Sequence, residues 1–210
     1  MTTDTLRTRE VITGVSEEEY FEQYAAFHYE WVKGQAIKMA PVHLRHVQLT
    51  NYLQQLLSAY LSLNPIGVVA GQPFVMRLQT LDISREPDLQ VILNTNPGQL
   101  TDTAMIGPAD ICIEIISPES VTRDYGENFV EYGNAGVPEY WIIDPIRRES
   151  RFYRLQDTGL YASAYPDEQG HYQTPRLPYF VLHVPTLWEK TLPDFYAVGQ
   201  AIQAMLKDVR

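Results

Sequence analysis

The stretches that decide the fold are EPDLQVIL at residues 86–93 and ADICIEII at residues 109–116. Both are short apolar runs rich in Ile, Leu and Val, a composition typical of buried β-strands. Each also carries a carboxylate where a buried strand favours a hydrophobic side chain: Asp88 in the first run and Glu114 in the second. A carboxylate in such a position loses hydration, which costs several kcal/mol unless a partner compensates.

Strand geometry predicts where these acids point. Side chains alternate between the two faces of a strand, so Asp88 and Glu114 each point away from the aliphatic side chains that flank them. If the two strands are neighbours, the carboxylates can converge on one Mg²⁺ ion, which often binds through only one or two carboxylates. The alternative is a buried ion pair between Glu114 and Arg77 or Arg123, and the spacing leaves both interpretations open.

Composition and charge narrow the class of protein. A hydrophobic fraction of 45% with 20% charged residues is typical of a folded chain, and 14 tyrosines favour an α/β or β-rich fold. The formal net charge of -10 disfavours non-specific adhesion to nucleic acid or anionic membranes. The single Cys112 excludes an intramolecular disulfide and a cysteine-rich metal site. No secretory leader or long apolar run is visible, so we expect a cytoplasmic protein without membrane contacts.

The first part of the chain predicts a helix-and-hairpin extension. Residues 1–15 lack periodicity, and we expect a loose arm there. A capping box at residues 16–19 predicts a short helix. A glycine turn predicts a hairpin over residues 29–39, and leucines at helical spacing predict a long helix over residues 43–63.

The rest of the chain predicts a sheet with helices. Residues 94–107 are expected to form a loop. Tyr125, Phe129 and Tyr132 form an apolar stripe on a predicted helix over residues 124–132, beside a polar stripe that includes Asn128. Further strands are predicted over residues 67–70, 72–78, 139–144, 151–155, 160–165 and 179–184, the first two as neighbours in one sheet, followed by a helix from Asp194.

These elements predict one domain over residues 16–210, of the α/β (α+β) class. Its core would be a mixed sheet flanked by helices, with β-rich additions at the C-terminus. Two features stay open at this point. His43 and His46, three residues apart at a helix start, are either a metal-binding pair or a polar pair. Glu30, beside Trp31 on the first hairpin strand, is either a solvated edge acid or a functional one.

Several stretches in combination resemble a known family. They are YEWVKG at 29–34, REPDL at 85–89, DICIEIISP at 110–118, RD at 123–124, Tyr132, and GVPEYWIIDP at 136–145. The chain resembles the Uma-type family of putative restriction endonucleases, a domain of unknown function placed in the PD-(D/E)XK nuclease superfamily. The similarity extends over nearly the whole chain, and EIISP together with GVPEYW is its most distinctive part.

The resemblance implies a restriction-endonuclease-like fold in which Asp88 and Glu114 hold Mg²⁺ or Mn²⁺. Glu30 matches an acid that such folds add to the metal ligands. A metal held there lowers the pKa of a bound water and stabilises charge on a phosphodiester. No other cofactor is implied.

One part of the family pattern is missing. The superfamily lysine stands two residues after the glutamate, where this chain has Ile116, or four residues after Asp124 in this family, where it has Asn128. Asn128 can hydrogen-bond a water or a phosphate oxygen but carries no charge. Lys38, Arg77 and Arg123 are the cations that could substitute. Loss of a charged partner of the transition state commonly costs about 10²–10³ in rate.

The resemblance therefore implies a Mg-dependent endodeoxyribonuclease with Asp88, Glu114 and Asn128 in the catalytic site. Its activity is expected to be weak or absent, because the lysine position holds asparagine. DNA is the expected partner, and a homodimer is the expected assembly, since many nucleases of the superfamily pair to reach both strands. The alternative is a non-catalytic module that uses the same fold to bind nucleic acid or to assemble.

Overall fold

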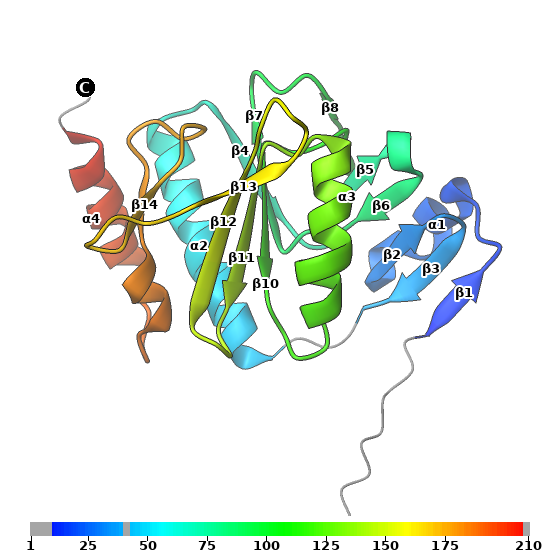
Figure 1. The fold of residues 1–210 in the computed structure, drawn as a ribbon, viewed down its shortest axis with the longest axis horizontal. Coiled ribbons are helices and arrows are strands. Elements are labelled where there is room, and N and C mark those ends of the chain that lie inside the picture. Colours follow the sequence, from blue (N-terminus) through cyan, green and yellow to red (C-terminus); the bar gives the residue numbers. More distant parts are fainter. Residues whose placement is uncertain (1–9, 40–42, 208–210) are drawn as a thin grey trace, which may run out of the picture.

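The protein, seen in a computed structural model that describes residues 10–39 and 43–207, has a central mixed sheet with helices on both faces (Figure 1). The strands of the sheet lie in the order β13-β12-β11-β10-β7-β4, with β10 and β11 parallel and the other pairs antiparallel. They are β4 (Gly67–Gly71), β7 (Leu89–Leu93), β10 (Ile111–Ile115), β11 (Glu139–Asp144), β12 (Glu149–Leu155) and β13 (Tyr161–Ala164). The predicted α/β class with a helix-flanked mixed sheet is confirmed.

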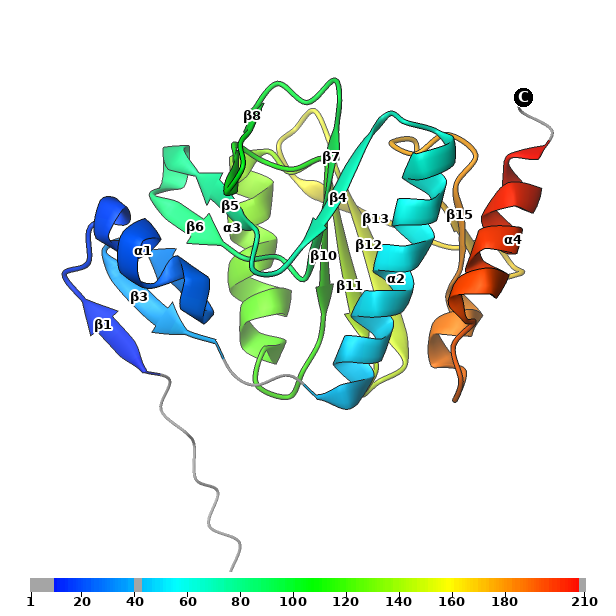
Figure 2. The same cartoon turned by 180° about the vertical axis from the view of Figure 1, so that it is seen from behind.

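Helices cover the two faces unequally. On one face lie α2 (Leu44–Leu63) and α4 (Phe195–Met205), side by side in both views (Figures 1 and 2). On the other lies α3 (Asn128–Ala135), which ends at Gly136 with a φ of 86°, the left-handed conformation that glycine favours. Within the described residues, no helix is both long and apolar enough to cross a lipid bilayer.

The side chains of the two central strands alternate between the two faces of the sheet, as predicted. β7 and β10 are antiparallel neighbours, with Cys112 opposite Gln90. One set of aliphatic side chains joins the core under α2 and α4: Leu89, Val91, Ile111, Ile113 and Ile115. Ile92 and Cys112, which alternate with them, join the core under α3. Glu114 alternates with the first set, so it points toward the α3 side of the sheet.

The N-terminal helix and hairpin belong to a second sheet, in the order β1-β3-β2-β6-β5-β9-β8. Ser16 caps α1 (Glu17–Gln23) by accepting a hydrogen bond from the backbone of Glu19, as predicted. The strands are β1 (Val11–Thr13), β2 (Tyr29–Val32), β3 (Gln35–Lys38), β5 (Val75–Leu78), β6 (Ile83–Arg85), β8 (Gln99–Leu100) and β9 (Ala104–Ile106). β2 and β3 confirm the predicted hairpin.

Three predictions differ from the structure around this sheet. A loose arm was expected over residues 1–15. Residues 1–9 lie outside the described residues, and the described part contains the strand β1, which pairs with β3. The loop expected over residues 94–107 contains the short strands β8 and β9. β4 and β5 belong to different sheets, because the chain turns after Gly71, whose carbonyl accepts from the backbone of Phe74.

The C-terminal part adds a small antiparallel pair, β14 (His171–Gln173) and β15 (Val181–His183), before α4. Asp194 caps α4 by accepting a hydrogen bond from the backbone N–H of Ala197 over 2.9 Å. The predicted β-rich C-terminal region and the final helix are thereby confirmed.

The turn after β11 is held by a buried aspartate. We therefore expect the free energy of unfolding to depend on pH. Asp144 accepts hydrogen bonds from the backbone N–H groups of Ile146 and Arg147, both over 2.9 Å, and from the Arg147 guanidinium. Burial by itself raises the pKa of Asp144, but these hydrogen bonds outweigh it and hold the pKa below the usual 3.8. The stabilisation is therefore complete above about pH 4 and is lost as the pH falls through the lowered pKa.

We expect Asp144→Asn to lower the free energy of unfolding by about 1–3 kcal/mol at pH 7, because the amide cannot accept all of these hydrogen bonds. The difference from the wild type should shrink at pH 3. Urea unfolding of both proteins at pH 7 and pH 3 measures it, with the exposed Asp157→Asn as the control. An equal difference at both pH values would contradict the account.

Candidate active site

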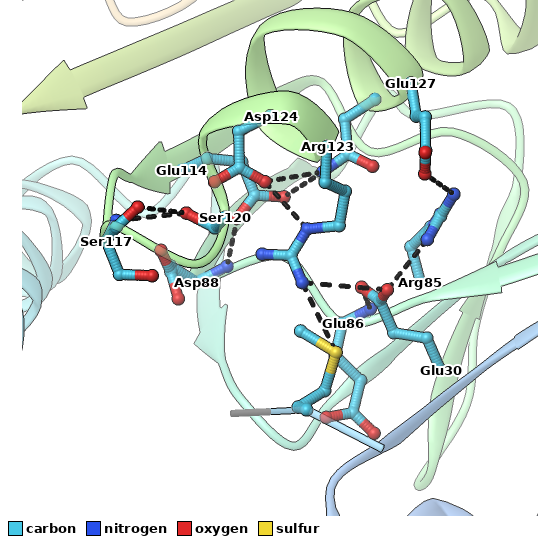
Figure 3. A network of polar contacts seen from close by, with 12 residues as sticks. Glu30, Arg85, Glu86, Asp88, Glu114, Ser117, Ser120, Arg123, Asp124 and Glu127 are labelled. Carbon is cyan, nitrogen blue, oxygen red and sulfur yellow. Dashed lines mark hydrogen bonds and ion pairs between the residues drawn. The ribbon is translucent and has the colours of Figure 1, made fainter. Parts of the chain in front are cut away.

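Asp88 and Glu114 meet beside the β7–β10 pair. Asp88 stands one residue before β7, and Glu114 lies within β10. The backbone N–H of Asp88 donates to Oε2 of Glu114 over 3.3 Å (Figure 3), and the backbone N–H of Ile115 donates to Oδ2 of Asp88 over 2.7 Å. Both acids are buried, with 4% and 1% of their surface exposed. The structure thus brings together the two acids that the strand pattern singled out.

A histidine from α2 adds a contact to Asp88. Nε2 of His46 lies 3.0 Å from Oδ2 of Asp88, and the ring is buried. His43 lies on the surface, 3.4 Å from Glu119, so the two histidines do not share a ligand. His46 carried a sequence signal, because it stands on the buried leucine stripe of α2. Its partner could not be deduced, since the two residues are 42 positions apart.

Helix α3 supplies two side chains to Glu114. Nδ2 of Asn128 donates to Oε1 of Glu114 over 3.1 Å, and the Tyr132 hydroxyl, one turn later, donates to the same oxygen over 2.7 Å. Nδ2 of Asn128 also lies 3.2 Å from Oδ1 of Asp124, while its own Oδ1 is buried without a hydrogen-bond partner among the described residues. A π-helical turn, Arg123–Glu127, precedes α3, a feature frequent at functional sites. The sequence placed Tyr132 on an apolar stripe and among the positions that carry the family resemblance, but it did not indicate a contact with Glu114.

The site concentrates buried negative charge. Burial, and after it the carboxylates of Asp124 and Asp88, raise the pKa of Glu114 well above its usual range. Burial also raises the pKa of Asp124, although Arg123 opposes this. A bound cation would remove this unfavourable repulsion.

The ion pair that the spacing left open for Glu114 is not formed. Nε of Arg123 instead contacts Oδ1 of Asp124 at 2.8 Å (Figure 3). Arg77 contacts Glu17 of α1, where its Nε donates over 2.9 Å. Glu114 is held by an amide, a hydroxyl and a backbone N–H. These donors orient the carboxylate without neutralising its charge.

Glu30 lies outside the Asp88–Glu114 pair. Its Oε2 accepts from the Arg85 guanidinium over 2.7 Å, and its Oε1 lies 3.5 Å from the backbone N–H of Glu86 (Figure 3). In the part of the chain that the structure describes, no three His, Cys, Asp or Glu side chains are grouped so that they could hold a metal ion. The structure therefore does not bring Glu30 together with Asp88 and Glu114, because the Glu30 carboxylate pairs with Arg85.

An open cavity of about 520 Å³ gives access to Asp88. Asp88 lines it together with two of the cations considered above, Lys38 and Arg123, whereas Arg77 is not part of its wall. The other lining residues come from the turn after α1, from the residue after β3, from α2, from the turn after β4, from the end of β10 and from the segment that follows it. They are Ala26, Phe27, His28, Met39, His46, Gln72, Ile115, Ser117, Glu119 and Ser120.

The residues present fit a two-carboxylate site for Mg²⁺ or Mn²⁺. Carboxylate oxygens are the donors that these hard cations prefer, and one or two of them suffice when waters and substrate oxygens complete the ligand set. Asp88 faces the cavity, and burial together with the carboxylates of Asp124 and Asp88 raises the pKa of Glu114, which a bound cation would lower again. His46 and Tyr132 hold the two carboxylates from the sides of α2 and α3.

Comparison with known proteins gives a family and a fold. The sequence model of the family described as "Uma2: Putative restriction endonuclease" matches residues 17–184. No curated protein matches the sequence. The chain is similar to a crystal structure described as a putative nuclease belonging to DUF820 from Anabaena variabilis ATCC 29413, with a TM-score of 0.68 and 18% identity. That similarity covers 81% of this chain and 96% of the other, and it shows the fold.

Proposed function

Since the chain belongs to the Uma2 family, described as putative restriction endonucleases, we propose that it is a metal-dependent endonuclease that hydrolyses phosphodiester bonds of DNA. The observation that carries the proposal is the contact between Asp88 and Glu114 at the wall of an open cavity. The proposal is also supported by the implied PD-(D/E)XK resemblance, whose pattern places two acids close together in this way, although its lysine is absent here.

In this proposal Asp88 and Glu114 hold Mg²⁺ or Mn²⁺. When bound, such an ion supplies a nucleophilic water at neutral pH and a Lewis acid for the phosphate. His46 orients the Asp88 carboxylate, and Tyr132 orients that of Glu114. Arg123 and Lys38, which line the cavity, provide positive charge for a phosphate group.

The proposal is tested by incubating the purified protein with supercoiled plasmid and Mg²⁺ or Mn²⁺. We expect nicked and then linear DNA, and no product when a chelator is added. Plasmid that stays supercoiled with both metals would overturn the proposal. That result would favour a non-catalytic module. The observation that supports this alternative is Asn128 in place of the family lysine.

Asn128 offers a direct test of the missing charge. Its side chain touches both Glu114 and Asp124, so a lysine ammonium there would lie between two carboxylates whose pKa values are raised. We expect Asn128→Lys to increase the rate of plasmid cleavage on the order of 10²-fold, the usual value of a charged partner. Asn128→Gln is the uncharged control of similar length. A lysine variant that folds and cleaves no faster than this control would contradict the expectation.

A further inference from the structure

An exposed aromatic ring stands at the wall of the cavity that contains Asp88. Phe27 is 64% exposed and lines this cavity together with Asp88 and Arg123. Its ring stacks on no other aromatic side chain within residues 10–39 and 43–207. A phenylalanine left in water forgoes the stabilisation of burial. At this place its exposed surface borders the cavity, where it can contact a ligand.

The backbone on both sides of the ring is fixed. The N–H of Phe27 donates to the carbonyl of Tyr24 over 2.9 Å, and Nζ of Lys38 donates to the carbonyl of Phe27 over 2.6 Å. The next residue, His28, has a φ of 57°, and its carbonyl accepts from the N–H of Met39 over 2.9 Å. A non-glycine residue in the left-handed region is uncommon and clusters at binding sites. Because the backbone of this turn is already ordered, binding of a ligand to the ring does not cost backbone conformational entropy there.

The net charge of the protein and the size of the cavity favour binding through base stacking over binding along the backbone of a duplex. The chain has 16 basic and 26 acidic residues, whereas a protein that follows a duplex through phosphate contacts needs a basic surface. Stacking on an aromatic ring does not depend on net charge and works with every base. The cavity volume of about 520 Å³ lies in the range of small-molecule sites, so it admits a local segment of a strand.

We propose that Phe27 stacks on an unpaired base of the substrate while a neighbouring phosphate lies in the cavity at Asp88. The preferred substrate is then single-stranded or locally unpaired DNA, because the bases of an intact duplex already stack on one another. This inference rests on the proposed function and names the substrate class of the same site.

Binding of a single-stranded oligonucleotide that contains 2-aminopurine tests the inference. The fluorescence of this base is quenched when it stacks. Ca²⁺ replaces Mg²⁺ during the titration, so that a cation still screens the carboxylates from the phosphate, and a gel run afterwards checks that the oligonucleotide is intact. We expect quenching with the wild type and with Phe27→Trp, and binding on the order of 10-fold weaker without quenching for Phe27→Ala. Phe195→Ala is the matched control, because Phe195 is also exposed, at 74%, and lies at the start of α4. It should bind like the wild type.

The outcomes separate this inference from the proposed function. Equal affinity and quenching for Phe27→Ala and the wild type would overturn the stacking role, whether or not plasmid is cleaved. A change in oligomeric state for Phe27→Ala, with unchanged oligonucleotide binding, would overturn it as well and assign the ring to a protein interface. A wild type that stacks the base but cleaves no DNA would leave Phe27 supported and the nuclease proposal refuted.

Discussion

Replacing Asp88 with asparagine is expected to reduce plasmid cleavage on the order of 10³-fold. The carboxylate receives the backbone N–H of Ile115 and lies against His46, and both contacts need an acceptor. Both contacts use the same oxygen, Oδ2, so an asparagine that keeps them with its amide oxygen places its NH₂ group where Oδ1 of Asp88 was. It also removes one of the two negative charges that the proposed metal site provides.

The comparison is made under single-turnover conditions with Mg²⁺, after circular dichroism has shown that the variant is folded. Asp102→Asn serves as the control, because Asp102 is exposed and lies on the turn between β8 and β9. It should cleave like the wild type. Cleavage by Asp88→Asn within about threefold of the wild type would remove Asp88 from the mechanism.

Replacing Arg85 with methionine is expected to lower the free energy of unfolding by about 3–5 kcal/mol. Arg85 is only 1% exposed, and its guanidinium contacts Oε2 of Glu30 and Oε2 of Glu131, each at 2.7 Å. Burial by itself raises the pKa of Glu30, but Arg85 and Arg123 outweigh it and lower the pKa. Without Arg85 the buried Glu30 loses its nearest counterion.

Urea unfolding at pH 7 measures the effect, and Arg77→Met is the matched control on the neighbouring strand β5. Arg77 pairs with Glu17 at a partly exposed position, so its replacement should cost less than about 1 kcal/mol. The double variant Arg85→Met, Glu30→Gln should recover part of the loss, because the more deeply buried of the two partner carboxylates is then removed and only the partly exposed Glu131 lacks its arginine. Similar small losses for both arginines would contradict the assignment of Arg85 as a buried counterion.

The parts of the fold that the sequence predicted are those set by local patterns. Leucines at helical spacing gave α2 within one residue, and the glycine turn gave the β2–β3 hairpin. Pairing between distant segments carried no such signal. β1 has only three residues and depends on its register with β3. The strands β4 and β5 were recognised, but the sheet to which each belongs depends on its neighbours. β4 pairs with β7, whereas β5 lies between β6 and β9.

The same distinction holds at the site. Alternation along the two strand segments was enough to place Asp88 and Glu114 together, because the neighbouring aliphatic side chains point to the opposite face of the sheet. The partners of these acids arrive from far along the chain, His46 from α2 and Tyr132 from α3. Glu30 was expected beside the metal, but it lies against Arg85, 55 residues away. An arginine can reach an acid from several neighbouring strands, so sequence spacing does not identify such a pair.

The central claim is that Asp88 and Glu114 form a divalent-metal site, and calorimetric titration with Mn²⁺ and Mg²⁺ tests it without reference to any substrate. We predict binding of one ion by the wild type, with proton release that increases as the pH is lowered, because the pKa of Glu114 is raised and a metal displaces its proton. Asp88→Asn should show no binding, and Asp102→Asn should bind like the wild type. Absence of binding by the wild type, or equal binding by Asp88→Asn, would contradict the account.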